Sequence, residues 1–556
     1  MLAGQPLSLL WPGSRPTAAL SRLDELAIAD LHLDEILRAI VGGGAPAGRL
    51  AARERFAHEV LTTLVRDTEI IAYRQAVLAD LLDNPSLREQ LEQVLPALEA
   101  LGDVPRGERY RPTAEPGLER VARRLADLEL LIDVVSRLSD ALDQAPLTSH
   151  GLRALAVQLQ DQRHAPEFAA LERELPALRH KLDSVRSVTI GVNLGPDLSP
   201  ESATILDLGA TPIQGRRGLL WRLLGGGASD RGLTALQRGE GGPLGRPNEL
   251  VRDLRHLLGQ VVAPVAVALE RFHRVSTSAM AQLGGELALL LGVARLVEQL
   301  RGAGLPVCRP DCAAMDDRST QLEDAYDLGL AVSRQVDARR IVTNPVRFDE
   351  RGGRVWVLTG PNRGGKTTYT RAVGLAQVLF QAGLYVPARS ARLSPADAIY
   401  THFPTREDNR PGFGRLDLEA ERLAAIFQRA TPHSLILLNE ALAGTSALEA
   451  LDLARGLVRG LRLLGARAIY VTHLHELASS VDEINATTPG DGTVASLLAD
   501  SDCAEDGASA GGPPVRRTYR IVPHAPRGVS FAAEIAEQHG ISFDQLARLL
   551  RERHLA

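Results

Sequence analysis

The segment that decides the fold of the C-terminal part reads Gly360-Pro361-Asn362-Arg363-Gly364-Gly365-Lys366-Thr367-Thr368. It directly follows the apolar run Arg354 to Thr359, which predicts a strand, and it matches the pattern G-x-x-x-x-G-K-[S/T]. Glycines let such a loop turn its backbone N–H groups toward phosphates, and the following helix adds the positive end of its dipole. We predict that these nine residues bind ATP, that Lys366 reaches the β- and γ-phosphates, and that the Thr367 hydroxyl ligates Mg²⁺.

The choice of lysine at position 366 supports this prediction. Of the 63 lysines and arginines in the chain only two are lysines, Lys181 and Lys366. A phosphate loop requires a compact ammonium, whereas the arginine guanidinium is a wide planar fork. Nearly all basic residues of the chain are arginines, yet a lysine stands at the one position where the motif requires it.

Two polar residues, Asn439 and Glu440, end a second apolar run, Leu435 to Leu438, which predicts another strand. In P-loop NTPases an acidic residue at such a strand end orients the Mg²⁺ water, and a following Glu polarises the attacking water. Glu440 fits the second, catalytic role. Asn439 takes the first position with a dipole instead of a charge, so we expect it to contact Mg²⁺ through water and hydrolysis to be slow. An incidental polar strand end is the weaker interpretation.

A third predicted strand, Ala468 to Val471, leads into His473. We predict that His473 contacts the γ-phosphate, and we assign it to the catalytic residues with Glu440. His473, His475 and Glu476 are also a possible metal cluster, but two neighbouring histidines at one strand end rarely suffice for an ion.

The order of predicted elements divides the chain into three parts. Helical patterns predict an all-α core domain in residues 1–165. Residues 166–332 predict helices of a long arm, or lever, with a small β-containing tip, here called the clamp, inserted at about residues 187–247. Residues 333–556 predict a P-loop α/β ATPase domain, in which helices cover both faces of a mostly parallel sheet.

Four stretches carry more specific expectations. A stripe from Phe168 to Val185 predicts a long arm helix that is kinked at Pro176 or begins near it, with an ordinary core helix as an equal alternative. Alternation from Val188 to Leu194 predicts a strand. Residues 249–332 predict helices, and residues 482–514 predict a loop or a hairpin before a strand at Arg517 to Val522 and two closing helices.

The inserted clamp is locally basic. Residues 211–247 carry six arginines against Asp230 and Glu240, which gives a local charge of +4 in a chain of net charge −5. We predict that Arg216, Arg217 and Arg222 contact DNA phosphates. The alternative is a solvated loop without a ligand.

Composition excludes several classes of protein. The chain has 556 residues, 45% apolar and 24% charged, as in soluble globular proteins of several domains. Three cysteines, with Cys308 and Cys312 four apart, predict neither a disulfide framework nor a zinc site. Charged residues interrupt the longest apolar stretch, and the first residues lack a basic signal region, so we expect no membrane association and a cytoplasmic location.

The motifs resemble those of the MutS DNA mismatch-repair family. Residues 358–371 are similar to its Walker A region, T-G-P-N-M-G-G-K-S-T-Y-M-R, residues 439–446 to its D-E-I-G-R-G-T-S, and residues 472–477 to its T-H-Y-x-E-L. Weaker similarity covers the C-terminal strand and helix, the helical core and the lever. The resemblance implies a homodimeric ATPase clamp, joined through its ATPase domains and C-terminal helices, that binds mismatched, branched or otherwise structured double-stranded DNA in repair or recombination.

The resemblance also assigns residues to two further contacts. Each ATP site is expected to be completed by the partner's signature segment, where Gly414 and Arg415 replace the family's Ser-Thr. Arg415 is then expected to substitute electrostatically for the missing hydroxyl at the γ-phosphate. Ile341 takes the place of the family's adenine-stacking aromatic, which implies apolar packing of the base.

One departure from the family concerns mismatch reading. The family reads mismatches with an N-terminal Phe-x-Glu wedge backed by a connector domain, but the only similar triplet, Phe348-Asp349-Glu350, adjoins the ATPase domain. We therefore expect a shortened member without these two domains and without a nuclease tail. The rival hypothesis is an ATP-driven conformational switch that holds a protein partner. An ABC transporter subunit is disfavoured because no L-S-G-G-Q run is present.

Overall fold

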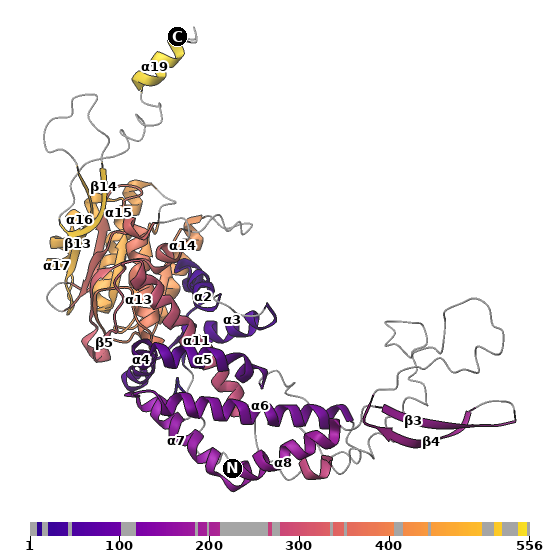
Figure 1. Cartoon of the computed structure of the whole chain (residues 1–556). Coiled ribbons are helices and arrows are strands. Elements are labelled where there is room, and N and C mark those ends of the chain that lie inside the picture. Colours follow the sequence, from indigo (N-terminus) through magenta and orange to yellow (C-terminus); the bar gives the residue numbers. More distant parts are fainter. Residues whose placement is uncertain are drawn as a thin grey trace. The chain divides into compact units, whose positions relative to one another are not determined.

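A computed structural model shows two compact units (Figure 1). One gathers Met1–Leu7, Gln93–Gln144 and Leu155–Gly284, and the other Ser8–Glu92, Ala145–Ala154 and Gly285–Ala556. The structure describes residues 8–13, 20–42, 47–101, 118–183, 187–196, 200–211, 265–269, 278–333, 337–349, 353–404, 415–442, 446–502, 516–524 and 543–552.

The smaller unit is built on two helices, α6 (Leu118–Asp143) and α8 (Pro166–Asp183). Their apolar faces share a core with the helical residues 265–269, and that core contains Val121, Leu125, Leu128, Leu171, Leu175, Leu178, Val265, Ala266 and Leu269. The part of the predicted stripe from Phe168 to Leu178 is buried on α8, as the core-helix alternative predicts, whereas Val185 lies outside the described residues. The prediction that a helix begins near Pro176 is wrong, because Pro176 lies inside α8.

The same unit contains an antiparallel hairpin, β3 (Ser187–Leu194) and β4 (Pro200–Gly209). It confirms the strand predicted from Val188 to Leu194. The arginines predicted to contact DNA, Arg216, Arg217 and Arg222, lie outside the described residues.

The larger unit contains a six-stranded sheet of order β10-β11-β12-β8-β13-β14. Its first five strands are parallel, and β14 is antiparallel at the edge. The strands are β8 (Val355–Thr359), β10 (Ile399–His402), β11 (Leu435–Asn439), β12 (Arg467–Val471), β13 (Val494–Asp502) and β14 (Arg516–Pro523). The four strands predicted near residues 355, 435, 468 and 517 are therefore confirmed.

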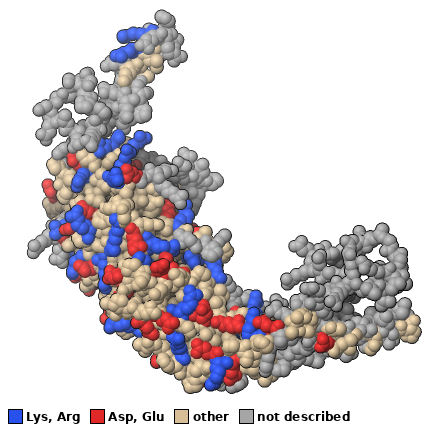
Figure 2. Space-filling model, viewed as in Figure 1, with Lys and Arg blue, Asp and Glu red and all other residues tan. Residues whose placement is uncertain are grey.

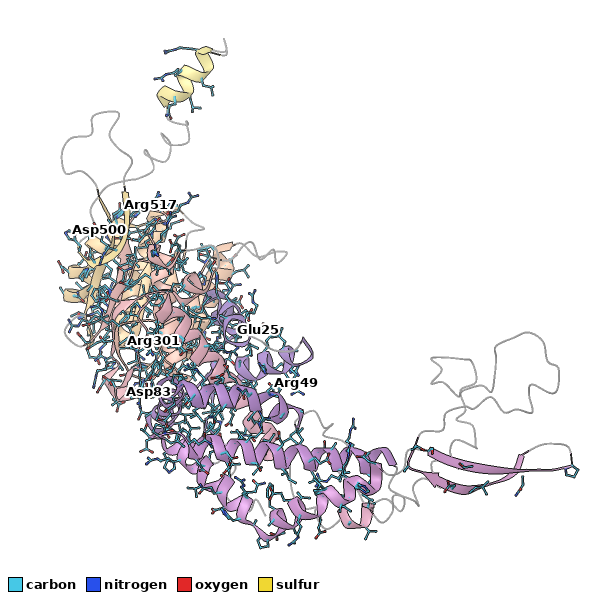
Figure 3. The ribbon with its side chains drawn as sticks, viewed as in Figure 1. Glu25, Arg49, Asp83, Arg301, Asp500 and Arg517 are labelled. Carbon is cyan, nitrogen blue, oxygen red and sulfur yellow. The ribbon has the colours of Figure 1, made fainter. Side chains whose placement is uncertain are left out.

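Helices cover this sheet because its strands are apolar on both faces. One face packs against α14 (Arg415–Arg429), α15 (Ala447–Leu464), α16 (His475–Ser479) and α17 (Val481–Thr487). The helix α13 (Lys366–Gln381) follows β8 and packs against β11 and β12. The prediction of a loop or a hairpin for residues 482–514 is wrong up to Thr487, because these residues belong to α17. The hairpin is confirmed from Val494 on, where β13 pairs with β14; Asp500 and Arg517, near the ends of these strands, are labelled in Figure 3.

A second sheet, of order β5-β9-β6-β7, corrects the helical prediction for residues 303–327. Its strands are β5 (Asp311–Cys312), β6 (Thr320–Ala325), β7 (Asn344–Phe348) and β9 (Ser390–Leu393). Helix α11 (Ser278–Gly302) ends before them. Partners distant in sequence make β6 a strand, since β7 pairs with one of its edges and β9 with the other. The expected domain boundary between residues 332 and 333 thus separates β6 from β7, which are neighbours in this sheet.

Four helices from the N-terminal part belong to the larger unit: α1 (Glu25–Asp30), α2 (Leu33–Val41), α3 (Ala47–Thr62) and α4 (Thr68–Asp83). The short helix α12 (Leu328–Val332) follows β6 of the second sheet. Helix α1 contacts β10, and α3 and α12 contact α13. The remaining elements are β1 (Ser21–Arg22), β2 (Thr63–Leu64), α5 (Pro85–Ala100), α7 (His150–His164), η1 (Met315–Asp317), η2 (Ala338–Arg340) and α19 (Phe543–Glu552). Within the described ranges no helix combines the length and apolar character of a membrane span.

The helix α13 is held close to its neighbours by Gly374. A Cβ at this position would lie 2.4 Å from Leu31 Cδ2 and 2.9 Å from Leu437 Cδ1. Both leucines are completely buried, so neither has free space to move into. The absence of a side chain at Gly374 therefore sets the distance between α13, the α1–α2 junction and β11.

We predict that Gly374→Ala lowers the free energy of unfolding by about 1–3 kcal/mol, because it overpacks this contact. The matched control is Gly456→Ala on α15, where a new Cβ meets nothing within 4 Å. There the substitution is expected to stabilise the helix by about 0.5–1 kcal/mol. Thermal unfolding of both variants measures the difference, and equal shifts would contradict the packing role of Gly374.

Candidate active site

Parallel strands bring the predicted site residues to one edge of the large sheet. The neighbours β8, β12 and β11 run in the same direction, so their carboxyl ends meet at that edge. The glycine-rich loop follows β8, His473 follows β12, and Asn439 ends β11. Ligands of open α/β sheets bind at this edge.

The glycine-rich loop has a backbone that side chains would obstruct. Gly360 has a φ of 132° and Gly365 a φ of 91°. A Cβ on Gly360 would lie 2.7 Å from Ala499 Cβ and 2.9 Å from its carbonyl oxygen, so β13 leaves room there only for glycine. Between them Arg363 has a φ of 60°, also left-handed. This strand–loop–helix geometry leaves a cradle of the kind that the sequence motif predicts for phosphates.

Lys366 is buried inside this loop. Its exposed fraction is 4%, and its Nζ donates to the carbonyl oxygens of Gly360 at 2.9 Å and Pro361 at 3.0 Å. Burial lowers the pKa of Lys366 from 10.5 to about 8, and the Glu440 carboxylate opposes that shift. The ammonium is therefore enclosed by the loop, where a bound anion would stabilise its charge.

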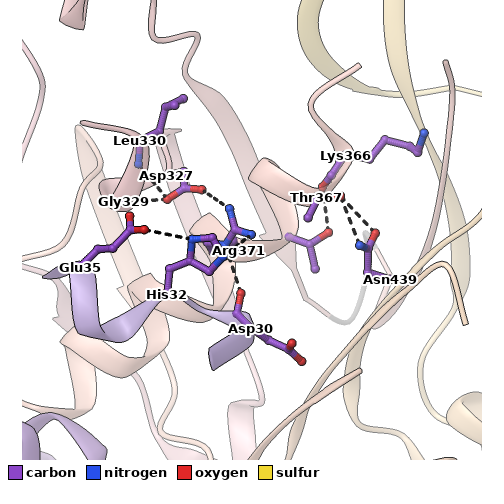
Figure 4. A network of polar contacts seen from close by, with 11 residues as sticks. Asp30, His32, Glu35, Asp327, Gly329, Leu330, Lys366, Thr367, Arg371 and Asn439 are labelled. Atoms are coloured by element: carbon purple, nitrogen blue, oxygen red, sulfur yellow. Dashed lines mark hydrogen bonds and ion pairs between the residues drawn. The ribbon is translucent and has the colours of Figure 1, made fainter. Parts of the chain in front are cut away.

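Thr367, the predicted Mg²⁺ ligand, faces Asn439. Its hydroxyl lies 3.4 Å from Asn439 Oδ1 and 3.2 Å from Asn439 Nδ2 (Figure 4). Asn439 is 3% exposed and is fixed at the end of β11. The structure thus joins the two residues that the sequence assigns to the metal, although they are 72 positions apart. A hydroxyl and an amide oxygen are ligand types that Mg²⁺ accepts.

Glu440 and His473 form a pair that the sequence did not predict. His473 Nε2 donates to Glu440 Oε1 at 2.8 Å. This hydrogen bond is the main reason why the pKa of Glu440 lies below its ordinary value, with smaller contributions from the charges of His473 and Lys366. Glu440 has a φ of 53°, and its N–H donates to the Val471 carbonyl at 2.9 Å. The carboxylate is thus kept ionised and aimed by its neighbours.

Comparison with known proteins gives two matches to models of the same family. Residues 356–496 match MutS domain V, and residues 66–303 match the MutS2 N-terminal domain. The chain belongs to the MutS family.

Curated MutS proteins are similar to parts of the chain. The DNA mismatch repair protein MutS of Symbiobacterium thermophilum is 32% identical over 244 residues, which cover 44% of this chain and 26% of that protein. The MutS of Sorangium cellulosum is 38% identical over 160 residues, 29% of this chain and 17% of that protein. The DNA mismatch repair protein MutS 2 of Halobacterium salinarum is 38% identical over 150 residues, 26% of this chain and 17% of that protein. The chain thus covers about a quarter or less of the length of these relatives.

The segment that MutS resemblance assigns to the partner's site begins α14. Gly414 lies outside the described residues, and Arg415 is the first residue of that helix. Further along α14, Glu419 accepts a hydrogen bond from the Leu442 N–H at 2.9 Å. This contact connects the signature helix to the loop that carries Glu440, within one chain.

The position assigned to adenine packing, Ile341, is half-buried at the end of the η2 turn. Three residues later, Asn344 Nδ2 donates to the Tyr519 carbonyl at 3.0 Å, and Asn344 Oδ1 accepts from the Ile521 N–H at 2.7 Å. Tyr519 has a φ of 57° and is 45% exposed, with its side chain against the Cβ position of Gly365. No local pattern points to Asn344, because its partners lie on β14, more than 170 positions away.

Proposed function

We propose that this MutS-family chain binds and slowly hydrolyses ATP with Mg²⁺, and that it uses this cycle as a homodimeric clamp on DNA. The observation that carries the proposal is the buried Lys366 in its glycine cradle, with the Thr367–Asn439 contact beside it. The geometry of the loop and of the Thr367–Asn439 contact supports the nucleotide site, and the similarity to DNA mismatch repair proteins supports the link to DNA.

Each residue of the site has a proposed role. The loop 360–368 surrounds the phosphates, and Lys366 exchanges its two carbonyl acceptors for phosphate oxygens. Thr367 would hold Mg²⁺ directly and Asn439 through water; the ion would neutralise charge on the phosphates. Glu440 accepts a hydrogen bond from the attacking water, and His473 keeps that carboxylate ionised beside the γ-phosphate. Ile341 packs on the base.

The dimer and the DNA contacts rest on the resemblance. The partner's Gly414 and Arg415 are proposed to complete each ATP site, and the ATPase domains to form the dimer. The DNA contacts are assigned to Arg216, Arg217 and Arg222 in the clamp insertion. On the face shown in Figure 2 acidic and basic side chains are intermixed over the described residues, so charge does not set apart a DNA-binding surface there. The proposed domains are residues 1–165, 166–332 and 333–556. Strands β5 and β6 lie in the second of these segments, but they form a sheet with β7 and β9 of the third.

The site predicts how ATP affinity depends on pH. The pKa of Lys366 in the free protein is about 8, and phosphates raise it because they stabilise the ammonium. Binding above this pH therefore requires the uptake of a proton, and affinity should fall above pH 8 by up to about tenfold per pH unit. Fluorescence titration of a labelled ATP analogue between pH 7 and pH 10 measures this fall.

Lys366→Arg is the control, because its guanidinium stays charged at every pH in that range. We expect weaker binding in this variant but no decline above pH 8 beyond what the nucleotide itself shows. Affinity of the parent that stays constant to pH 10, or an equal decline in both proteins, would contradict the assignment of Lys366 to the phosphates.

DNA binding separates the clamp from the rival switch that holds a protein partner. Replacing Arg216, Arg217 and Arg222 with Gln should weaken binding uniformly across DNA sequences, and should flatten the salt dependence by up to about three units, because phosphate contacts release counterions. The control replaces three arginines of the same unit that pair with acidic residues, Arg137, Arg163 and Arg179. A parent without salt-dependent DNA binding would favour the rival, and equal losses in both variants would refute these contacts.

A further inference from the structure

Arg371 lies one helical turn after Thr367 on α13 and holds three groups at once. Its Nε donates to the Asp30 carbonyl at 3.1 Å, and its Nη1 pairs with Asp327 Oδ2 at 3.2 Å. Its Nη2 lies 3.3 Å from His32 Nε2, which accepts the hydrogen bond as a neutral ring (Figure 4). Residues four apart in a helix share a face, so Arg371 and Thr367 move together with the first turns of α13.

Asp30 connects Arg371 to the strand at the edge of the sheet. While its carbonyl accepts from Arg371, its carboxylate accepts from Thr401 Oγ1 at 2.7 Å and from the Phe403 N–H at 3.2 Å. Thr401 lies on β10, which pairs with β11, the strand that ends at Asn439. One aspartate thus joins the P-loop helix to the strand beside the Asn439 strand.

The junction between α1 and α2 is shaped to fit α13. Leu31 packs at Gly374, less than one turn beyond Arg371. His32 adopts a left-handed conformation, with φ 53° and ψ 40°, which is unfavourable for residues other than glycine. That conformation turns the ring toward Arg371, and its Nδ1 lies 3.6 Å from Glu35. The junction is therefore held by a polar contact at Arg371 and an apolar contact at Gly374, within one turn of α13.

Asp327 supplies the charge that fixes the guanidinium. It is 3% exposed, and its Oδ1 caps α12 by accepting from the Gly329 N–H at 2.9 Å. Its other oxygen remains for Arg371, whose side chain is 17% exposed. A buried carboxylate that caps a helix has little freedom, so it provides a rigid anchor.

We infer that Arg371 is a positioning residue for the Mg²⁺ ligand Thr367, and that through it the α1–α2 junction responds to nucleotide. By binding Asp30, His32 and Asp327 it fixes the first turns of α13, so a shift of Thr367 at the metal reaches residues 24–41. Only a planar fork with several donors serves carbonyl, carboxylate and imidazole together. The inference rests on the proposed nucleotide site.

Amide hydrogen exchange of the full chain tests this inference, with and without a non-hydrolysable ATP analogue and Mg²⁺. In the parent, exchange should slow in peptides from the loop 360–371, and by about fivefold or more in peptides from residues 24–41. In Arg371→Gln the loop should still respond, whereas residues 24–41 should not. Arg371→Lys keeps the charge but not the fork, so it should retain only part of the response.

Two further variants keep the test decisive. Arg389→Gln removes an ion pair with Asp324 on the second sheet and should behave as the parent. Asp327→Asn removes the charge that anchors Arg371, so residues 24–41 should lose their response in this variant too. It takes the place of Arg371→Gln in the test if Arg371→Gln does not fold. An equal response of residues 24–41 in the parent and the Gln variants would overturn the inference, as would a fully parental Lys variant or a parent in which only the loop responds. A parent whose loop does not respond would overturn the proposed function and this inference with it.

Discussion

The contact between the Thr367 hydroxyl and the Asn439 amide is the constraint on which the site depends. It joins the start of the P-loop helix to the end of β11, although β12 lies between β11 and β8 in the sheet. Helix α13 must therefore lie across the sheet and close to it, and Gly374 permits that approach at Leu437. Without this crossing, the glycine-rich loop and the Asn439-Glu440 strand end would be separate features.

An amide at this position changes the electrostatics of the site. Lys366 and Glu440 already place one positive and one negative group there, and each acts on the pKa of the other. A second carboxylate beside Glu440 would add repulsion in the absence of metal. Asn439 keeps the contact with Thr367 and avoids that repulsion, but it offers no negative charge to a bound Mg²⁺. The smaller negative charge at the proposed metal position is the physical reason for the slow hydrolysis that we propose.

Left-handed residues other than glycine gather around this site and its anchor. Arg363, Glu440, Tyr519 and His32 all have a φ between 53° and 60°. Such conformations persist only where surrounding contacts impose them. The contacts are visible: the Val471 carbonyl holds Glu440, Asn344 holds Tyr519, and Arg371 contacts His32. Identified contacts thus hold three of these four left-handed residues, Glu440, Tyr519 and His32.

Local signals explain which features the sequence predicted. The phosphate loop, Asn439 and Glu440 follow strands that are apolar throughout, so a motif and its periodicity suffice to find them. The helical prediction for residues 249–332 is wrong for β5 and β6, because β6 becomes a strand only through partners on β7 and β9. Arg371 stands out in the sequence only as the end of a motif, since its partner Asp30 is 341 positions away and no local pattern points to their contact. The His473–Glu440 bond was missed for a similar reason, as it depends on which strands are neighbours.

The central claim is that Thr367 ligates Mg²⁺ beside a neutral Asn439, and a magnesium titration of nucleotide binding tests it directly. Labelled ATP analogue would be titrated at increasing Mg²⁺ with the parent, Asn439→Asp and Thr367→Val. A carboxylate adds a charge-assisted contact, so Asn439→Asp should lower the Mg²⁺ concentration for half-maximal binding by about tenfold. Thr367→Val should bind the nucleotide without metal as the parent does and lose the gain from Mg²⁺. An Asp variant that needs as much Mg²⁺ as the parent, or a Val variant that keeps the full gain, would contradict the account.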